Sequence, residues 1–195
     1  MKAFDNQTTT KILLSAANKK TDSEKCLYIF AGPNGSGKST LIANCYAEGK
    51  LECPYINADL NCITKFSEIE DENQRNERAM FYTIEQVKNM IKEGKSFCYE
   101  TVLSHPSKLD IMKSAKKAGF KIKAVFVYTK SPEINIERVK LRALQGGHDV
   151  PVDKIEKRYY RSLENSKILK EIADEFFMFD NSQNLIIEKC DREML

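Results

Sequence analysis

Apolar residues in this chain gather in short runs, and longer segments with helical spacing separate them. Residues 26–31 form a nearly continuous apolar run, which is typical of a strand buried on both faces of a parallel sheet. β-Branched and aromatic content predicts the remaining strands. We expect strands at residues 26–31, 54–57, 95–99, 120–128, 176–180 and 185–187.

The segments between these runs predict helices. Met80, Ile84, Val87 and Ile91 recur at spacings of four, three and four, which places them on one face of a helix that Gly94 ends. The other helices are expected to begin near residues 41, 109, 132 and 150.

Alternation of strands and helices indicates the fold class. Ser131 and Pro132 suit the N-cap and the first position of the helix that follows residue 131. Strands that alternate with helices predict an α/β fold with three layers and a mostly parallel sheet of five to six strands. Residues 1–24 are polar and lack a sustained apolar period, so we expect a tail there and a single domain over residues 25–195.

Composition narrows the classes of protein that remain. The chain of 195 residues carries a formal charge of +3, which is too small to indicate a nucleic-acid partner. The six cysteines form no C-x-x-C pair, so neither a zinc site nor a disulfide framework is predicted. No run approaches the roughly 18 apolar residues of a membrane span, and residues 12–14 are too short for a signal peptide. We therefore expect a cytoplasmic protein without membrane contact.

Residues 32–40 fit the pattern G-x-x-x-x-G-K-[ST], and they stand between a predicted strand and a predicted helix. In such a loop, backbone N–H groups point at phosphate oxygens, and the following helix adds the positive end of its dipole. Lys38 is expected to contact the β- and γ-phosphates of ATP, and the Ser39 hydroxyl to join the shell of a Mg²⁺ ion. The predicted nucleotide ligands in this loop are Gly32, Pro33, Asn34, Gly35, Ser36, Gly37, Lys38, Ser39 and Thr40.

Acidic residues follow several predicted strands, where ligands of open α/β sheets bind. Asp59 comes after the second strand and is a candidate base, while Glu100 comes after the third and could contact metal-bound water or a substrate hydroxyl. Asp180 also ends an apolar strand, but its late position favours an edge strand that delivers Asn181 toward the adenine base. An ordinary Asx-type turn is the alternative for Asn181.

Arginines in residues 138–161 are candidate phosphate ligands. Arg138 and Arg142 lie one helical turn apart, and no acid lies three or four residues from either one, an arrangement that is unfavourable unless an anion lies between them. Arg158 also has no acid three or four residues away, whereas Arg161 can reach Glu164. We predict a lid over residues 138–161 that closes on ATP, with a solvated basic face as the alternative. The basic and aromatic residues 157–161 are weak grounds for RNA contact.

This order of parts resembles the small P-loop kinases, and within them the zeta toxin family. Four segments carry the resemblance: the loop 32–40, residues 56–59 (INAD), residues 99–104 (YETVLS) and residues 138–163 with GGHDVP. The resemblance implies an ATP-dependent kinase that phosphorylates a hydroxyl of UDP-N-acetylglucosamine and that a small antitoxin inhibits.

The resemblance also implies roles for single residues. By position, Lys38 and Ser39 bind phosphate and Mg²⁺, Asp59 is the base, Glu100 and Thr101 face the substrate, and the arginines hold phosphates. His148 stands where we would expect another lid arginine, and it is a candidate substrate contact.

Other classes of P-loop protein compete with this reading. An ABC-type ATPase would need an L-S-G-G-Q motif, which residues 144–148 do not match. A nucleotide-binding switch would not need the arginines of the lid. A kinase for another small metabolite or an antibiotic uses the same parts, and the sequence does not choose between these acceptors.

Overall fold

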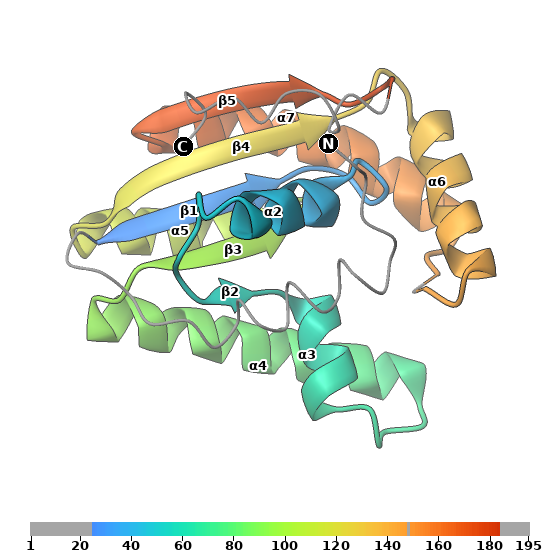
Figure 1. The fold of residues 1–195 in the computed structure, drawn as a ribbon, viewed down its shortest axis with the longest axis horizontal. Coiled ribbons are helices and arrows are strands. Elements are labelled where there is room, and N and C mark those ends of the chain that lie inside the picture. Colours follow the sequence, from blue (N-terminus) through green and yellow to red (C-terminus); the bar gives the residue numbers. More distant parts are fainter. Residues whose placement is uncertain (1–24, 148, 184–195) are drawn as a thin grey trace.

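A computed structural model of the chain describes residues 25–147 and 149–183. Its centre is a five-stranded parallel sheet with the strand order β2-β3-β1-β4-β5 (Figure 1). The strands are β1 (Cys26–Ala31), β2 (Tyr55–Ile56), β3 (Phe97–Thr101), β4 (Lys121–Tyr128) and β5 (Glu175–Asp180). β1 lies between β3 and β4 in the middle of the sheet, as its apolar run predicts.

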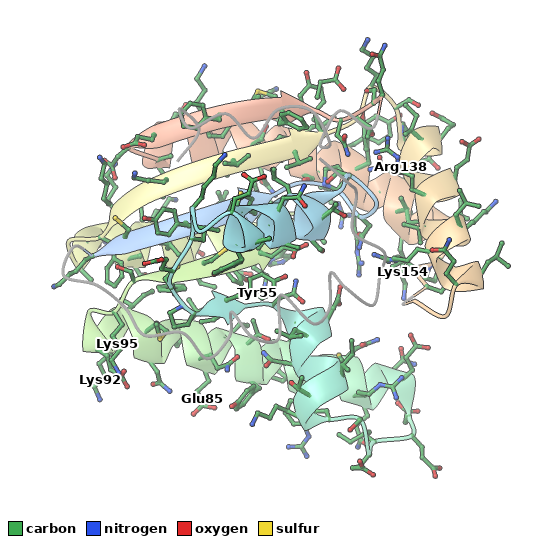
Figure 2. All side chains as sticks on the ribbon, in the orientation of Figure 1. Tyr55, Glu85, Lys92, Lys95, Arg138 and Lys154 are labelled. Carbon is green, nitrogen blue, oxygen red and sulfur yellow. The ribbon has the colours of Figure 1, made fainter. Side chains whose placement is uncertain are left out.

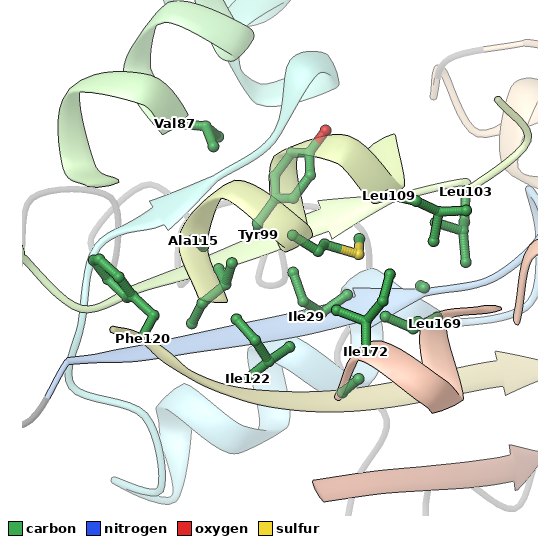
Figure 3. Packing of buried hydrophobic residues seen from close by; sticks show 14 of the residues in the cluster. Ile29, Val87, Tyr99, Leu103, Leu109, Ala115, Phe120, Ile122, Leu169 and Ile172 are labelled. Carbon is green, nitrogen blue, oxygen red and sulfur yellow. The ribbon is translucent and has the colours of Figure 1, made fainter. Parts of the chain in front are cut away.

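Helices cover both faces of the sheet, which gives the three predicted layers (Figure 1). They are α2 (Lys38–Ala47), α3 (Ala58–Lys65), α4 (Glu72–Glu93), α5 (Ser107–Lys117), α6 (Pro132–Leu144) and α7 (Val152–Ile172). Leu41 and Ile42 of α2 pack with Phe30 on one face. Leu109 of α5 and Leu169 of α7 pack on the other face, in the cluster that Figure 3 shows.

The predicted α/β fold and its parallel sheet are confirmed, with small shifts at the ends of the elements. β3 includes Glu100 and Thr101, which were expected just beyond the strand. Ser131 occupies the N-cap position of α6, and Pro132 begins the helix, but the Ser131 side chain makes no capping hydrogen bond. The start of α6 was therefore predicted correctly from the Ser131-Pro132 sequence, although Ser131 does not cap the helix through its side chain.

The sequence reading missed α3 and the first turns of α4. Both helices start at a side-chain cap: Asn57 Oδ1 accepts from Leu60 N at 2.9 Å, and Asp71 Oδ1 accepts from Gln74 N at 2.7 Å. Asp59 was expected at the end of the second strand, but it lies in the first turn of α3. These caps were the available signal, since α3 is short.

The loop 32–37 packs tightly against neighbouring backbone. A Cβ atom on Gly32 would lie 1.9 Å from Val127 O, and one on Gly35 would lie 2.6 Å from Asn135 O. Both glycines also have positive φ, at 146° and 77°. The glycines thus let the loop press against the end of β4 and the start of α6.

The predicted lid, residues 138–161, corresponds to the second half of α6, the first half of α7 and the residues between them. Val139, Val150 and Ile155 form a small buried cluster of their own, with Ile136 packed against it. In Figure 1, α6 stands at the end of the sheet to which the strand arrows point. The segment therefore has internal packing that is separate from the two large cores.

Some predictions fall outside the described residues, namely the tail 1–24, His148 and the strand expected at 185–187. Over residues 25–147 and 149–183, none of the helices combines the length and the apolar character that a bilayer crossing requires.

Candidate active site

A cavity of about 910 Å³ opens at the carboxyl ends of the strands, where the phosphate-binding loop begins. It brings together segments that are far apart in sequence: the loop and α2, the β2–α3 junction, α4, the β3–α5 segment, and helices α6 and α7. Of the predicted site residues, it is lined by Asn34, Gly35, Gly37, Lys38, Ser39, Thr40, Asp59, Glu100, Thr101, Arg138, Arg142, Arg158 and Asn181. Arg161 is not among its lining residues.

Lys38 is buried, with 6% of its surface exposed, and it lies at the centre of the site's charges. Its Nζ donates a hydrogen bond of 2.8 Å to Pro33 O, within the same loop. Burial lowers the pKa of Lys38, the negative charges of Glu100 and Asp59 oppose that effect, and Arg142 adds to it. The structure therefore brings Lys38, Glu100, Asp59 and Arg142 within electrostatic reach of one another.

Glu100 is buried and receives hydrogen bonds from two other elements. The Ser39 hydroxyl donates to its Oε1 at 2.9 Å and to its Oε2 at 3.2 Å, and the Tyr55 hydroxyl donates to Oε2. Figure 2 places Tyr55 on β2, the strand next to β3. Burial raises the pKa of Glu100, while Lys38 and the hydrogen bonds from Tyr55 and Ser39 lower it. The hydrogen bonds from Ser39 and Tyr55 thus hold the Glu100 carboxyl group next to the phosphate-binding loop.

Ser39 and Glu100 offer the oxygen ligands that Mg²⁺ prefers. Among the described residues no cluster of three His, Cys, Asp or Glu side chains could hold a metal. A Mg²⁺ ion beside a nucleotide takes one or two protein ligands and completes its shell with phosphate oxygens and water. The Ser39–Glu100 pair therefore fits the ion that the sequence predicts, and it gives Glu100 a place beside the metal and not only beside a substrate.

Asp59 faces the cavity from the first turn of α3 and is exposed. Its charge acts on both Lys38 and Glu100, raising the pKa of each. The backbone N–H groups of the first turn also favour a negative charge at this position. An exposed carboxylate beside the loop lysine is suited to receive a proton from a hydroxyl that enters the cavity.

Thr101 lines the cavity, and its hydroxyl also shapes the segment after β3. Its Oγ1 accepts from Leu103 N at 3.1 Å, and Leu103 has a φ of 58°, in the left-handed region. Asn165 of α7 donates to Leu103 O at 2.8 Å, which fixes this turn from behind. A non-glycine residue in that region carries strain that its surroundings must offset. The turn redirects the chain along the cavity toward α5.

Arg138 and Asn181 connect the loop to the end of β5. Asn181 Nδ2 donates to Ser36 O at 2.8 Å, and Arg138 Nη2 donates to Asn181 O at 2.7 Å and to Ser182 O at 3.3 Å. Figure 2 shows Arg138 at α6, next to the ends of β4 and β5. Both side chains line the cavity, but these bonds also hold the loop in place. Arg138 is thus partnered by carbonyls distant in sequence, which its local neighbours could not reveal.

Several residues in and around the cavity were not identified from the sequence. Tyr55 has no local signal, because only the pairing of β2 with β3 brings it to Glu100. Ser104, His105 and Lys108 line the cavity from the segment after β3. Their position directly after a predicted strand end was a signal that could have found them.

Known proteins match this chain in sequence and in fold. An uncharacterized protein from Haemophilus influenzae is 32% identical over 132 residues, which are 67% of this chain and 89% of that protein. The structure of the PezAT chromosomal toxin-antitoxin system of Streptococcus pneumoniae gives a TM-score of 0.63 at 14% identity, covering 94% of this chain and 81% of that one. AvrRxo1-ORF1:-ORF2 with ATP gives a TM-score of 0.63 at 14% identity, covering 85% and 56%.

At these low identities the two structures establish the fold alone. The sequence adds a family model, described as zeta toxin, that matches residues 11–190. The chain belongs to the zeta toxin family.

Proposed function

We propose that this protein is an ATP-dependent kinase that transfers the γ-phosphoryl group of ATP to a hydroxyl of UDP-N-acetylglucosamine or a related nucleotide sugar. The observation that carries the proposal is the joint placement of Lys38, the Ser39–Glu100 pair and Asp59 around one cavity. A phosphotransferase needs a cation for the phosphates, oxygen ligands for Mg²⁺ and a carboxylate for the acceptor hydroxyl.

Each group has a distinct task in this proposal. The backbone of the loop and Lys38 hold the β- and γ-phosphates, and Ser39 with Glu100 holds Mg²⁺, which neutralises phosphate charge. Asp59 orients the acceptor hydroxyl and accepts its proton. Arg142 and Arg158 come from the lid and stabilise the charge that develops on the transferred group.

A closed lid has a further purpose in a kinase. Water that reached the γ-phosphate would hydrolyse ATP without transfer, so closure over the cavity favours the acceptor. Gly146 has a positive φ of 80° and Gly147 has no side chain, and we propose these two glycines as the hinge of the lid. His148, the next residue in the sequence, is proposed as a substrate contact.

The direct test is incubation of the purified protein with ATP, Mg²⁺ and a panel of acceptors, followed by mass analysis of the products. A phosphorylated nucleotide sugar supports the proposal. Phosphorylation of another metabolite or an antibiotic instead identifies the alternative kinase. ATP hydrolysis without any phosphorylated product would identify a non-transferring ATPase and contradict the proposal.

We also propose a small antitoxin-like protein as partner, which would dock on the N-terminal tail and the mouth of the cavity. The family and the toxin-antitoxin system among the structural neighbours support this. Expression without a partner in bacteria should slow growth, and Lys38→Ala should relieve the effect. Unimpaired growth with active enzyme would favour a housekeeping kinase.

A further inference from the structure

Tyr55 acts on the active site from beneath its surface. The side chain lies on β2 (Figure 2), only 3% of its surface is exposed, and it is not among the described residues that line the cavity. Its hydroxyl donates to Oε2 of Glu100, while its ring packs in the hydrophobic cluster between α2 and the sheet. A ligand in the cavity would contact Glu100 and not Tyr55, so any effect of Tyr55 on ligands passes through Glu100.

Strand pairing and packing fix the position of the Tyr55 hydroxyl. Tyr55 pairs with Cys98 in the parallel register of β2 and β3, and Glu100 follows two residues later on the same face of the sheet. From α2, Tyr46 packs edge to face on the Tyr55 ring, with 6.4 Å between the ring centroids. The Tyr46 hydroxyl donates to Cys53 O at 2.7 Å, just before β2. The Tyr55 ring is thus held from two sides, and the acceptor of its hydroxyl is Glu100.

Hydrogen bonds to other groups keep Glu100 and Lys38 apart. Both side chains are buried, with 8% and 6% of their surfaces exposed, and opposite charges attract strongly where water is excluded. In the part of the chain that the structure describes, these two side chains nevertheless form no ion pair. Lys38 Nζ donates to Pro33 O, and Glu100 accepts from Ser39 and Tyr55. Without the Tyr55 hydroxyl, Oε2 would keep only the 3.2 Å bond from Ser39 and would be drawn toward Lys38.

We propose that Tyr55 is a positioning residue for the Mg²⁺ site: its hydroxyl keeps the Glu100 carboxylate beside Ser39 and away from Lys38. This arrangement leaves Lys38 to the phosphates and Glu100 to the metal. The inference rests on the proposed function, in which Ser39 and Glu100 hold the ion. Groups that hydrogen-bond a ligating carboxylate from behind orient it, and their loss typically lowers metal affinity about 10- to 100-fold. Removal of the Tyr55 hydroxyl should therefore weaken the metal site while leaving both ligands in place.

A binding experiment tests this without phosphotransfer. Mn²⁺, a paramagnetic substitute for Mg²⁺, is titrated into the purified protein with one equivalent of a non-hydrolysable ATP analogue, and free Mn²⁺ is measured by EPR. Tyr55→Phe should raise the Kd for Mn²⁺ about 10- to 100-fold. Tyr46→Phe is the matched control, because it also removes a buried tyrosine hydroxyl, but one that bonds Cys53 O instead of a carboxylate. Circular dichroism checks that both variants are folded at the temperature of the titration.

An unchanged Kd in Tyr55→Phe, or an equal rise in both variants, would overturn the inference. Turnover with an identified acceptor gives a second readout. Tyr55→Phe should need more Mg²⁺ for half-maximal turnover, and saturating Mg²⁺ should restore kcat to near the wild-type value. A kcat that stays low at saturating Mg²⁺ would also overturn the inference, because the defect would then not lie in metal binding. If no acceptor is phosphorylated, the proposed function fails, but the Mn²⁺ titration still decides the role of Tyr55.

Discussion

The hydroxyl of Ser39 donates a 2.9 Å hydrogen bond to the carboxylate of Glu100, although 61 residues separate them along the chain. β1 and β3 are neighbours in the sheet, with Phe30 opposite Glu100, and this register brings the end of β3 to the phosphate-binding loop. The pair that we propose as metal ligands is therefore brought together by strand order and not by local sequence.

Lys38→Met should abolish phosphotransfer while leaving a folded protein. Methionine keeps most of the buried volume, but it removes the side-chain cation from the phosphates, which should lower turnover at least about a hundredfold. Turnover is measured with ATP and the best acceptor, and circular dichroism checks the fold. Lys50→Met, a substitution outside the cavity, is the control. Near-normal turnover of Lys38→Met would show that the loop does not serve phosphotransfer.

Asp59→Asn should separate transfer from ATP binding. Asparagine keeps the size of the side chain but cannot accept the hydroxyl proton, so transfer should fall about 10²- to 10⁴-fold with ATP affinity retained. Initial rates and ATP titrations measure the two quantities. A collapse of ATP affinity would make Asp59 a metal ligand, and no change in either quantity would leave Glu100 as the base.

Glu100→Gln should change how stability depends on pH. The carboxyl has an ordinary pKa of 4.5, and burial raises its pKa in the folded protein. Below pH 4.5 it is protonated in both states, but as pH rises through the raised pKa the folded protein must ionise a buried acid that the unfolded chain ionises freely. The free energy of unfolding of the wild type should therefore fall over that window.

Thermal melts without nucleotide, from about pH 4.5 to about pH 7.5, test this linkage. The difference in Tm between Glu100→Gln and the wild type should grow in favour of the variant as pH rises. Added Mg²⁺ with an ATP analogue should stabilise the wild type more than the variant. A constant difference across pH would contradict the buried, ionising carboxyl.

Asn181→Ala should loosen the phosphate-binding loop. The side chain is buried, with 3% of its surface exposed, and it donates to Ser36 O. Its loss leaves a buried carbonyl without that donor, so the free energy of unfolding should drop by about 1–3 kcal/mol, and KM for ATP should rise. Chemical denaturation and ATP kinetics measure both effects. Gln183→Ala, two residues further on and exposed, is the control. Unchanged KM for ATP would show that β5 does not position the loop.

Hydrogen exchange should detect closure of residues 138–161. An ATP analogue is expected to increase amide protection in this segment through contacts of Arg142 and Arg158, while the buried strand β1 stays unchanged. Equal protection with and without the analogue would contradict a closing lid.

The sequence by itself determined those elements that a short stretch of consecutive residues specifies. The loop 32–40 was recognisable because its glycines and Lys38 act through the backbone of one short segment, and β1 was recognisable because a central strand is apolar on both faces. Asp59 and Glu100 were found as acids near strand ends, although Asp59 proved to lie on a helix that a single cap, Asn57, begins.

Only the tertiary structure decided what these residues contact. The hydrogen bonds from Tyr55 to Glu100 and from Asn181 to Ser36 join residues far apart in sequence, and the carbonyl partners of Arg138 come from the end of β5. Such pairs depend on which strands are neighbours and in what register, and hydrophobic periodicity carries no information on either.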